Sequence, residues 1–193
     1  MSFGRGFSLI EMLVVLFVIV LMTSLVTLNV NSGASDRVVQ ERLDALVSVA
    51  EYALDEAQFS GSDFGVLFAS SVSDQGESMI TAHWRQRVPQ GWREPRLSQE
   101  VFSAVEFPPE ARLQIILDDV ELVPVASDAV DPRAGTAPQW LMSASGETQV
   151  GELLVRSRDD DALLWRLEWD SLGQFEQFRG EDDEPISGYA LVP

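Results

Sequence analysis

The residue with the most unusual chemistry in this sequence is Glu11, a carboxylate inside a long apolar stretch. The chain opens MSFGRGFSLIEMLVVLFVIV, and after Glu11 no charged residue occurs until Asp36. An ionisable side chain within a membrane segment costs about 2.5–3.5 kcal/mol on insertion scales, and such residues usually serve a function. Glu11 could therefore bind a cationic group, or it could extend to the lipid headgroups near the end of the segment.

The rest of the sequence offers little for catalysis. His83 is the only histidine, no nucleophile motif surrounds the serines, and no glycine-rich phosphate loop occurs. An alternating strand would set the His83 ring on the opposite side from Ile80, Ala82 and Trp84, so we expect it to be exposed or half-exposed. We predict that the protein is not an enzyme and that it has no catalytic residues and no cofactor.

Two acidic clusters could bind calcium through their oxygens. They are Asp159-Asp160-Asp161 and Glu181-Asp182-Asp183-Glu184. Neither has the alternating ligand spacing of a dedicated calcium loop, so we interpret both as solvated turns and predict no metal site. The five tryptophans are assigned to packing and not to a ligand cage; they are Trp84, Trp92, Trp140, Trp165 and Trp169.

Composition limits the partners of the chain. Its 193 residues suit one globular domain with an appendage, and 46% of them are hydrophobic, which is enough for a core. The net charge is −18, and all 13 basic residues are arginine. A protein with this much negative charge repels the phosphate backbone of DNA and RNA, so we expect no nucleic acid partner. Cysteine is absent, which excludes disulfides and thiolate metal sites.

The segment from Met12 to Val30 has 19 residues without a charge. A helix needs about 20 such residues to cross the hydrocarbon of a bilayer. Arg5 precedes the segment and no arginine follows until Arg37, which favours a cytoplasmic N-terminus. A cleaved signal peptide is the alternative. The short basic region, the long apolar run and the lack of a small-x-small cleavage site favour an anchor instead.

The elements after this segment predict an α+β protein. Between Asp36 and Gln58 an apolar stripe recurs every three or four residues, as in an amphipathic helix; it comprises Val39, Leu43, Leu46, Ala50, Ala53 and Ala57. Asn31-Ser32-Gly33 is a possible kink between the two halves of this helix. After Gly61 short alternating runs predict half-buried antiparallel strands; they include 64–68, 80–84, 113–117, 152–157, 162–170 and 174–179. We expect loops at Gln86–Pro109 and Pro124–Pro138, and an acidic tail or edge segment at Gly180–Pro193.

The N-terminal residues Gly6-Phe7-Ser8-Leu9-Ile10-Glu11 resemble the class III signal of type IV pilins and type II secretion pseudopilins. The match covers about twenty residues. Looser matches extend the resemblance, and they favour the minor pseudopilin H branch of the family. These are Ala53–Ala57 with Asp63–Phe68, Ser143–Thr148 with Gly151–Val155, and Leu172-Gly173.

This resemblance implies a pilin-like fold, in which a long N-terminal helix packs on an antiparallel β-sheet domain. It implies cleavage between Gly6 and Phe7 by the prepilin peptidase, and N-methylation of Phe7. Glu11 then lies five residues into the mature chain. The implied divisions are a leader (1–6), the transmembrane half of the helix (7–30), its amphipathic half (31–60) and a periplasmic β domain (61–193).

The same resemblance assigns Glu11 to assembly. The methylated amine of one subunit could reach the carboxylate of its neighbour in a fibre, where the pairing would fix axial register more than add stability. The implied function is a minor pseudopilin at or near the tip of a type II secretion pseudopilus, supporting the export of folded proteins. The chain would be single-pass in the bacterial inner membrane, with the other minor pseudopilins, the major pseudopilin and membrane lipid as partners. A minor pilin of a type IV pilus, serving adhesion, motility or DNA uptake, is the alternative.

Overall fold

The computed structural model describes residues 9–72, 76–96, 100–130 and 135–186, and within the long helix it leaves the side chains of residues 23–35 undescribed. The chain divides into two compact units, Met1–Arg37 and Val38–Pro193. We treat each unit by itself. The predicted cleavage and methylation residues, Gly6 and Phe7, lie outside the described residues.

The helix α1 runs from Leu9 to Ser60 and has 52 residues. A local break at Asn31-Ser32-Gly33 is not seen, because α1 passes through these residues without interruption. The helix ends at a left-handed glycine, Gly61, at φ 66°, whose amide donates to the carbonyl of Ala57 at 3.0 Å. Glycine adopts this conformation without steric penalty, so it is a common helix terminator.

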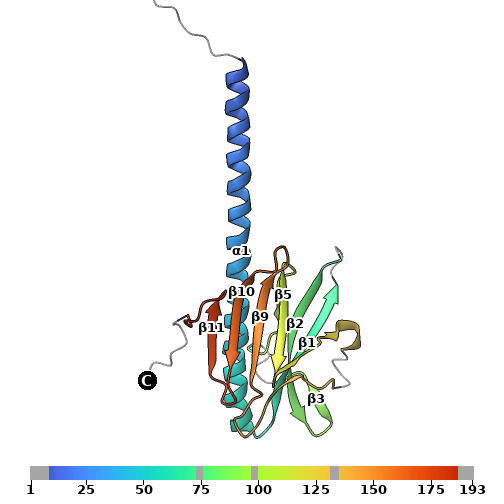
Figure 1. The fold of residues 1–193 in the computed structure, drawn as a ribbon. Coiled ribbons are helices and arrows are strands. Elements are labelled where there is room, and N and C mark those ends of the chain that lie inside the picture. The colour runs from blue at the N-terminus through green and yellow to red at the C-terminus, as the bar shows by residue number, and fades with distance from the viewer. Residues whose placement is uncertain (1–8, 73–75, 97–99, 131–134, 187–193) are drawn as a thin grey trace, which may run out of the picture. The chain divides into compact units, whose positions relative to one another are not determined.

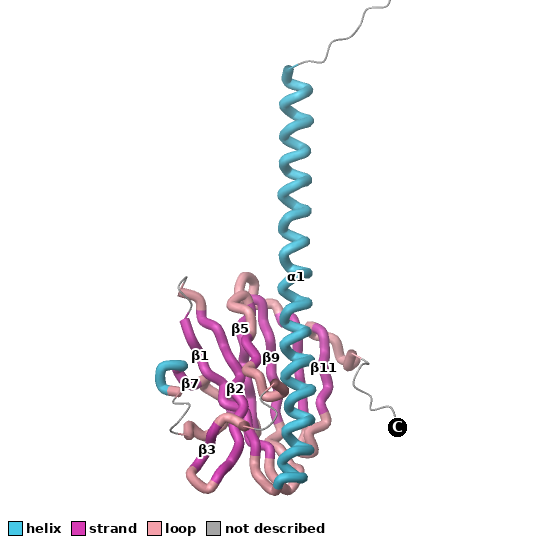
Figure 2. The backbone as a smooth tube through the Cα atoms, turned by 180° about the vertical axis from the view of Figure 1, so that it is seen from behind, coloured by secondary structure: helices cyan, strands magenta, loops and turns pink. Residues whose placement is uncertain are grey.

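The second unit contains two β-sheets, where the sequence predicted one antiparallel sheet domain. The six-stranded sheet is formed by β1 (Phe64–Val72), β2 (Ser78–Val88), β3 (Gly91–Arg93), β4 (Val105–Glu106), β7 (Val125–Ala126) and β8 (Trp140–Met142). The five-stranded sheet has the order β11-β10-β9-β5-β6, with β5 (Ala111–Leu117), β6 (Val120–Glu121), β9 (Gly151–Ser157), β10 (Leu163–Trp169) and β11 (Phe175–Arg179). Figures 1 and 2 show both sheets from opposite sides.

The pairing is antiparallel with one exception: β7 runs parallel to β1, through Ala69–Val125 and Ser70–Ala126. Both predicted loops contain short elements. The first, Gln86–Pro109, includes the end of β2 together with β3 and β4, and the second, Pro124–Pro138, includes β7 and a 3-10 helix at Ser127–Ala129. The expectation of plain loops there was wrong, because two- and three-residue strands are too short to show an alternating pattern.

The core lies where the second half of α1 meets the sheets. All six residues of the predicted stripe, Val39 to Ala57, are buried, as are the large side chains of the strands. The stripe is therefore confirmed as a packing surface of α1 within the second unit, where the helix runs along the five-stranded sheet between β9 and β11 (Figure 2). Gln177 on β11 adds a polar link, because its side-chain amide donates to the Asp44 carboxylate on α1 at 3.1 Å.

The five tryptophans are packing residues, as predicted, since none is more than 9% exposed. Trp140 stacks at a tilt on Trp169 with ring centroids 4.4 Å apart. Its indole N–H donates to the Thr148 hydroxyl at 2.7 Å, and that hydroxyl donates onward to the Leu141 carbonyl. This chain of bonds satisfies the polar end of a buried aromatic residue.

One strand departs from the predicted half-buried pattern. β1 lies between β2 on one edge and β7 and β8 on the other, and its first six residues are all buried. Gly65 shows how close the packing is, because a Cβ atom there would lie 2.5 Å from the Trp140 carbonyl oxygen. The glycine therefore lets β8 approach β1.

Candidate assembly site

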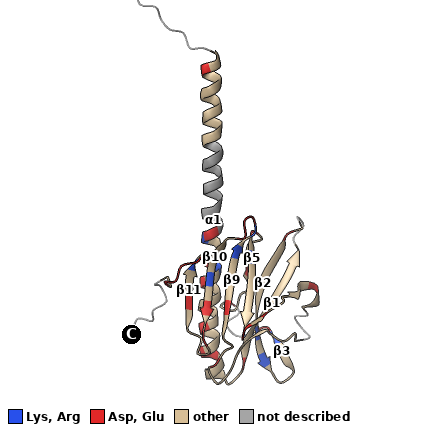
Figure 3. Ribbon diagram, viewed as in Figure 1, with Lys and Arg blue, Asp and Glu red and all other residues tan. Residues whose placement is uncertain are grey.

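The described start of α1 is an apolar surface with one charge in it. Every described side chain from Leu9 to Met22 is exposed, and Glu11 is the single ionisable residue among them (Figure 3). Exposed fractions of the large apolar side chains there run from 45% at Val18 to 84% at Leu9. A contiguous apolar surface of this kind marks an interaction with a membrane or another protein.

Within this surface Glu11 lies in the first turn of α1. The positive end of the helix macrodipole favours a carboxylate at that place. Among the described residues, the Glu11 carboxylate therefore lies near the start of α1 on an exposed apolar surface. Within the part of the chain that the structure describes, no helix combines the length and the apolar character needed to cross a membrane.

The other residues considered from the sequence lie on the second unit. His83 is half-buried on β2, as expected, and burial, followed by the nearby charge of Arg85, lowers its pKa. Its imidazole is therefore neutral at pH 7. Three charged residues act on the ring, namely Arg85, Glu94 and Glu106, and the first two are an ion pair at 3.4 Å.

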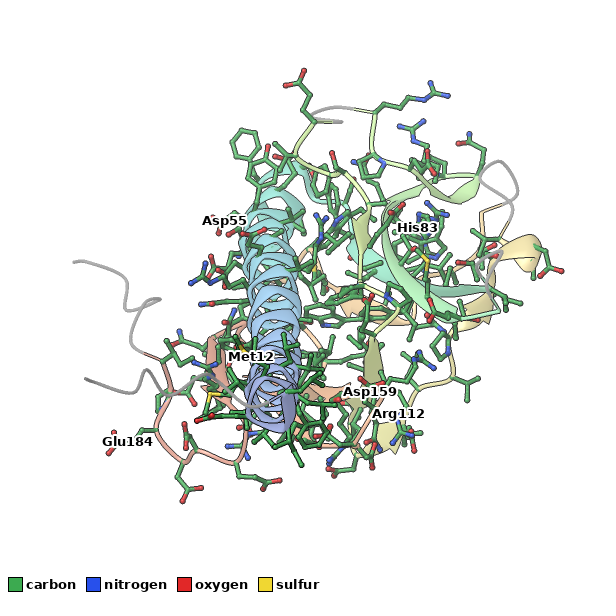
Figure 4. All side chains as sticks on the ribbon, turned by 90° about the horizontal axis from the view of Figure 1, so that it is seen from above. Met12, Asp55, His83, Arg112, Asp159 and Glu184 are labelled. Atoms are coloured by element: carbon green, nitrogen blue, oxygen red, sulfur yellow. The ribbon has the colours of Figure 1, made fainter. Side chains whose placement is uncertain are left out.

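The first acidic cluster is a turn held by its own hydrogen bonds. Asp161 has φ 59° and pairs with Arg112 at 2.6 Å, and both side chains are exposed. A hydrogen bond from Ser157, followed by one from the Ala162 amide, lowers the pKa of Asp160. Arg112 and Asp159, labelled in Figure 4, mark this end of the five-stranded sheet. Among the described residues no group of three or more histidine, aspartate or glutamate side chains is placed to hold a metal ion.

The turn at Ser143–Thr148 is closely tied to the rest of the second unit. Gly146 has φ 90°, and a Cβ there would meet the side chain of Gln58 on α1 at 2.8 Å. The Ala144 amide donates to the Asp63 carboxylate at 3.0 Å, and the Thr148 amide donates to the Ser171 carbonyl at 2.9 Å. The turn thus joins the end of α1 to the turn before β11, which gives it a structural role.

Sequence reasoning missed Arg85. Its side chain is only 2% exposed and it contacts Glu94, whose side chain is 61% exposed. Burial lowers the pKa of its guanidinium, and Glu94 acts in the opposite direction. The available signal was the concentration of arginines at 85, 87, 93 and 96 in an otherwise acidic chain.

The fold of this chain is similar to that of solved minor pseudopilin structures. The structure of EpsH, the minor pseudopilin from the type 2 secretion system of Vibrio cholerae, aligns with a TM-score of 0.52 and 17% identity. The alignment covers 73% of this chain and 96% of EpsH. A second EpsH structure gives a TM-score of 0.52 and 16% identity, over 74% of this chain and 96% of that one.

The solution structure of Escherichia coli GspH aligns over 78% of this chain and 94% of its own length, at 18% identity and a TM-score of 0.49. No protein-family model matches the chain, and a search of curated proteins finds no match. The resemblance to minor pseudopilin H is thus confirmed at the level of the fold.

Proposed function

We propose that the chain is a minor pseudopilin of a type II secretion system, a non-enzymatic subunit at or near the pseudopilus tip that supports assembly and export of folded proteins. The observation that carries this proposal is the fold shared with EpsH over 96% of the EpsH chain. The exposed apolar start of α1, with Glu11 in its first turn, supports it, because a fibre subunit needs such a surface to join its neighbours.

The same proposal assigns parts to the chain. Residues 1–6 are a leader, 7–30 the transmembrane half of the helix, 31–60 its amphipathic half, and 61–193 a periplasmic domain. The protein is anchored in the bacterial inner membrane with a cytoplasmic N-terminus before it enters the pseudopilus. Its partners are the other minor pseudopilins, the major pseudopilin, the prepilin peptidase and membrane lipid. The 19 uncharged residues from Met12 to Val30 support the anchor.

Deleting the gene tests this function against the pilus alternative. We expect the deletion strain to retain its secreted proteins in the periplasm while surface motility stays normal. A plasmid copy of the wild-type gene should restore secretion, which controls for effects on neighbouring genes. Normal secretion with lost motility or DNA uptake would reject the proposal in favour of a type IV pilus.

Processing gives a second prediction, which concerns Gly6 and Phe7. We expect the membrane-extracted protein to begin at an N-methylated Phe7, as measured by mass spectrometry of the intact chain and its N-terminal peptide. Gly6→Val should leave the precursor uncut, because a branched side chain would crowd the peptidase cleft, whereas Ser2→Val in the same leader should be processed normally. A mature chain that begins at Met1 or beyond Val30 would contradict this cleavage site.

A further inference from the structure

The five-stranded sheet has one face in the core and one face without a covering element. The side chains on the core face belong to the cluster that includes the stripe of α1; among them are Leu113, Leu153, Leu167 and Phe175. Figures 1 and 2 show α1 on that side of the sheet, and no described helix or strand lies over the other side. We call this other side the outer face. It is an unpartnered surface of four adjacent strands, β5, β9, β10 and β11.

The pairing register places three glutamates side by side at one end of the outer face. Glu168 on β10 lies directly opposite Glu152 on β9 and Glu176 on β11. Like charges that are directly opposite each other on neighbouring strands destabilise a sheet. Arg166 forms an ion pair with Glu168 at 2.9 Å, but among the described residues no ion pair reaches Glu152 or Glu176. This acidic row therefore keeps a surplus of negative charge.

The same register gives the outer face a middle row and a basic row. Along β9, Glu152 is followed on this face by Leu154, which is half-buried, and then by Arg156. Arg156 lies directly opposite Arg112 on β5. Asp161 compensates these two arginines in part, because its carboxylate pairs with Arg112 at 2.6 Å and its backbone carbonyl accepts from Arg156 at 3.3 Å. The face thus changes from acidic to apolar to basic over four residues, or about 13 Å.

The acidic end of the outer face is also concave. A hollow of about 890 Å³ lies there, and its lining includes the three glutamates together with Ile116 and Val150. Ile116 lies opposite Glu152 in the register of β5 and β9, and Val150 is 50% exposed. The hollow therefore has apolar walls beside its carboxylates. Such a lining suits an arginine, whose stem is apolar and whose head is a cation.

We propose that the outer face binds an extended segment of a partner protein whose side chains facing the sheet are basic, apolar and acidic in that order. In an extended segment the side chains on one face recur every second residue, which matches the spacing of the three rows. The basic side chain enters the hollow, the apolar one covers Leu154, and the acidic one meets Arg112 and Arg156. Complementary charges of both signs fix the direction in which the segment lies.

Peptide binding to the full-length protein in detergent tests this surface. The probe is Arg-Thr-Leu-Thr-Glu blocked at both ends. Its matched control, Leu-Arg-Glu-Thr-Thr, has the same composition and net charge without the alternating order. We expect the probe to bind about fivefold more tightly at low salt, measured by titration of the amide resonances of β9 and β10. High salt should remove most of this difference, because exposed ion pairs are screened. Equal affinities at low salt would overturn the proposal.

A charge reversal separates the surface from the overall charge of the protein. Glu176→Lys should weaken binding of the probe about tenfold and strengthen binding of Glu-Thr-Leu-Thr-Glu several-fold. Asp55→Lys is the control, because it makes the same change of charge at an exposed position on α1, labelled in Figure 4. It should change neither affinity more than about twofold. Loss of binding in Asp55→Lys, or wild-type binding in Glu176→Lys, would contradict the assignment.

Two further measurements control for folding and for self-association. Glu176→Lys removes a like-charge contact with Glu168, so its melting temperature should not fall below that of the wild type. Light scattering should show a monomer for both proteins in detergent. A wild-type dimer that Glu176→Lys separates would reject a different protein as the occupant, in favour of a second copy of this chain. The proposal concerns the second unit alone and does not depend on the secretion phenotype, so the failure of one proposal would leave the other standing.

Discussion

Replacing Leu46 with aspartate should unfold the second unit of the protein. Leu46 is fully buried on α1, in the core cluster that joins the helix to both sheets. The substitution loses the burial of a leucine, worth about 1.5–3 kcal/mol, and places a carboxylate where it has no partner. We expect a loss of more than about 4 kcal/mol, a large fraction of the 5–15 kcal/mol typical of a folded domain.

The measurement is thermal unfolding of the full-length protein in detergent, followed by near-UV circular dichroism of the buried tryptophans. Ser48→Asp is the matched control, because it adds the same charge to an exposed position two residues away on the same helix. It should leave the melting temperature within a few degrees of the wild type. A Leu46→Asp variant that melts like the wild type would show that the stripe does not hold this unit together.

Replacing Glu11 with alanine should abolish assembly while leaving processing and folding intact. Glu11 lies in the first unit, in the first turn of α1, whereas the core that holds the β-sheets belongs to the second unit. If the carboxylate pairs with a neighbouring subunit's amine, its loss should eliminate co-purification of this protein with its sibling pseudopilins. Secretion should fall with it, to the level of the deletion strain.

Two further substitutions separate charge from shape at Glu11. Glu11→Asp keeps the anion but withdraws it by one methylene, so we expect a partial defect. Glu11→Gln keeps the shape without the charge and should resemble alanine more than aspartate. Co-purification with the siblings and a secretion assay are the readouts, and a mature N-terminus at Phe7 in each variant is the control. Normal assembly in both the alanine and glutamine variants would contradict this prediction. It would show that Glu11 is merely tolerated near the lipid headgroups and is not needed for assembly.

The sequence could predict the helices and strands that bury one face in the core and expose the other face to solvent. In the second half of α1 apolar residues recur every three or four positions, and in the strand Leu163–Trp169 they recur every second position. Each pattern arises because the element packs on one side only. The run 64–68 predicted the strand β1, but not that its first six residues would be buried on both faces. The short strands β3, β4 and β7 depend on the strands they pair with, and that context is not local to their residues.

Glu11 and Arg85 also differ in whether the sequence alone could identify them. Glu11 stands out because a carboxylate in a long apolar run is visible in the sequence itself. Arg85 does not stand out, because its burial is a property of the folded sheet, in which β2 pairs with β1, β3 and β4. An arginine in an alternating strand would ordinarily face the solvent. The burial of Arg85 therefore could be identified only from the structure.

The order of synthesis matters for how this protein reaches its native state. The stripe of α1 is made early, but it is covered by strands that include β10 and β11, the last strands in the chain. The bond between Gln177 and Asp44 closes a loop of most of the second unit. Such distant contacts form slowly, because chain entropy must be lost before they contribute. The apolar stripe therefore stays uncovered until these strands have been made, and a folding helper that shields it would raise the yield of the native protein.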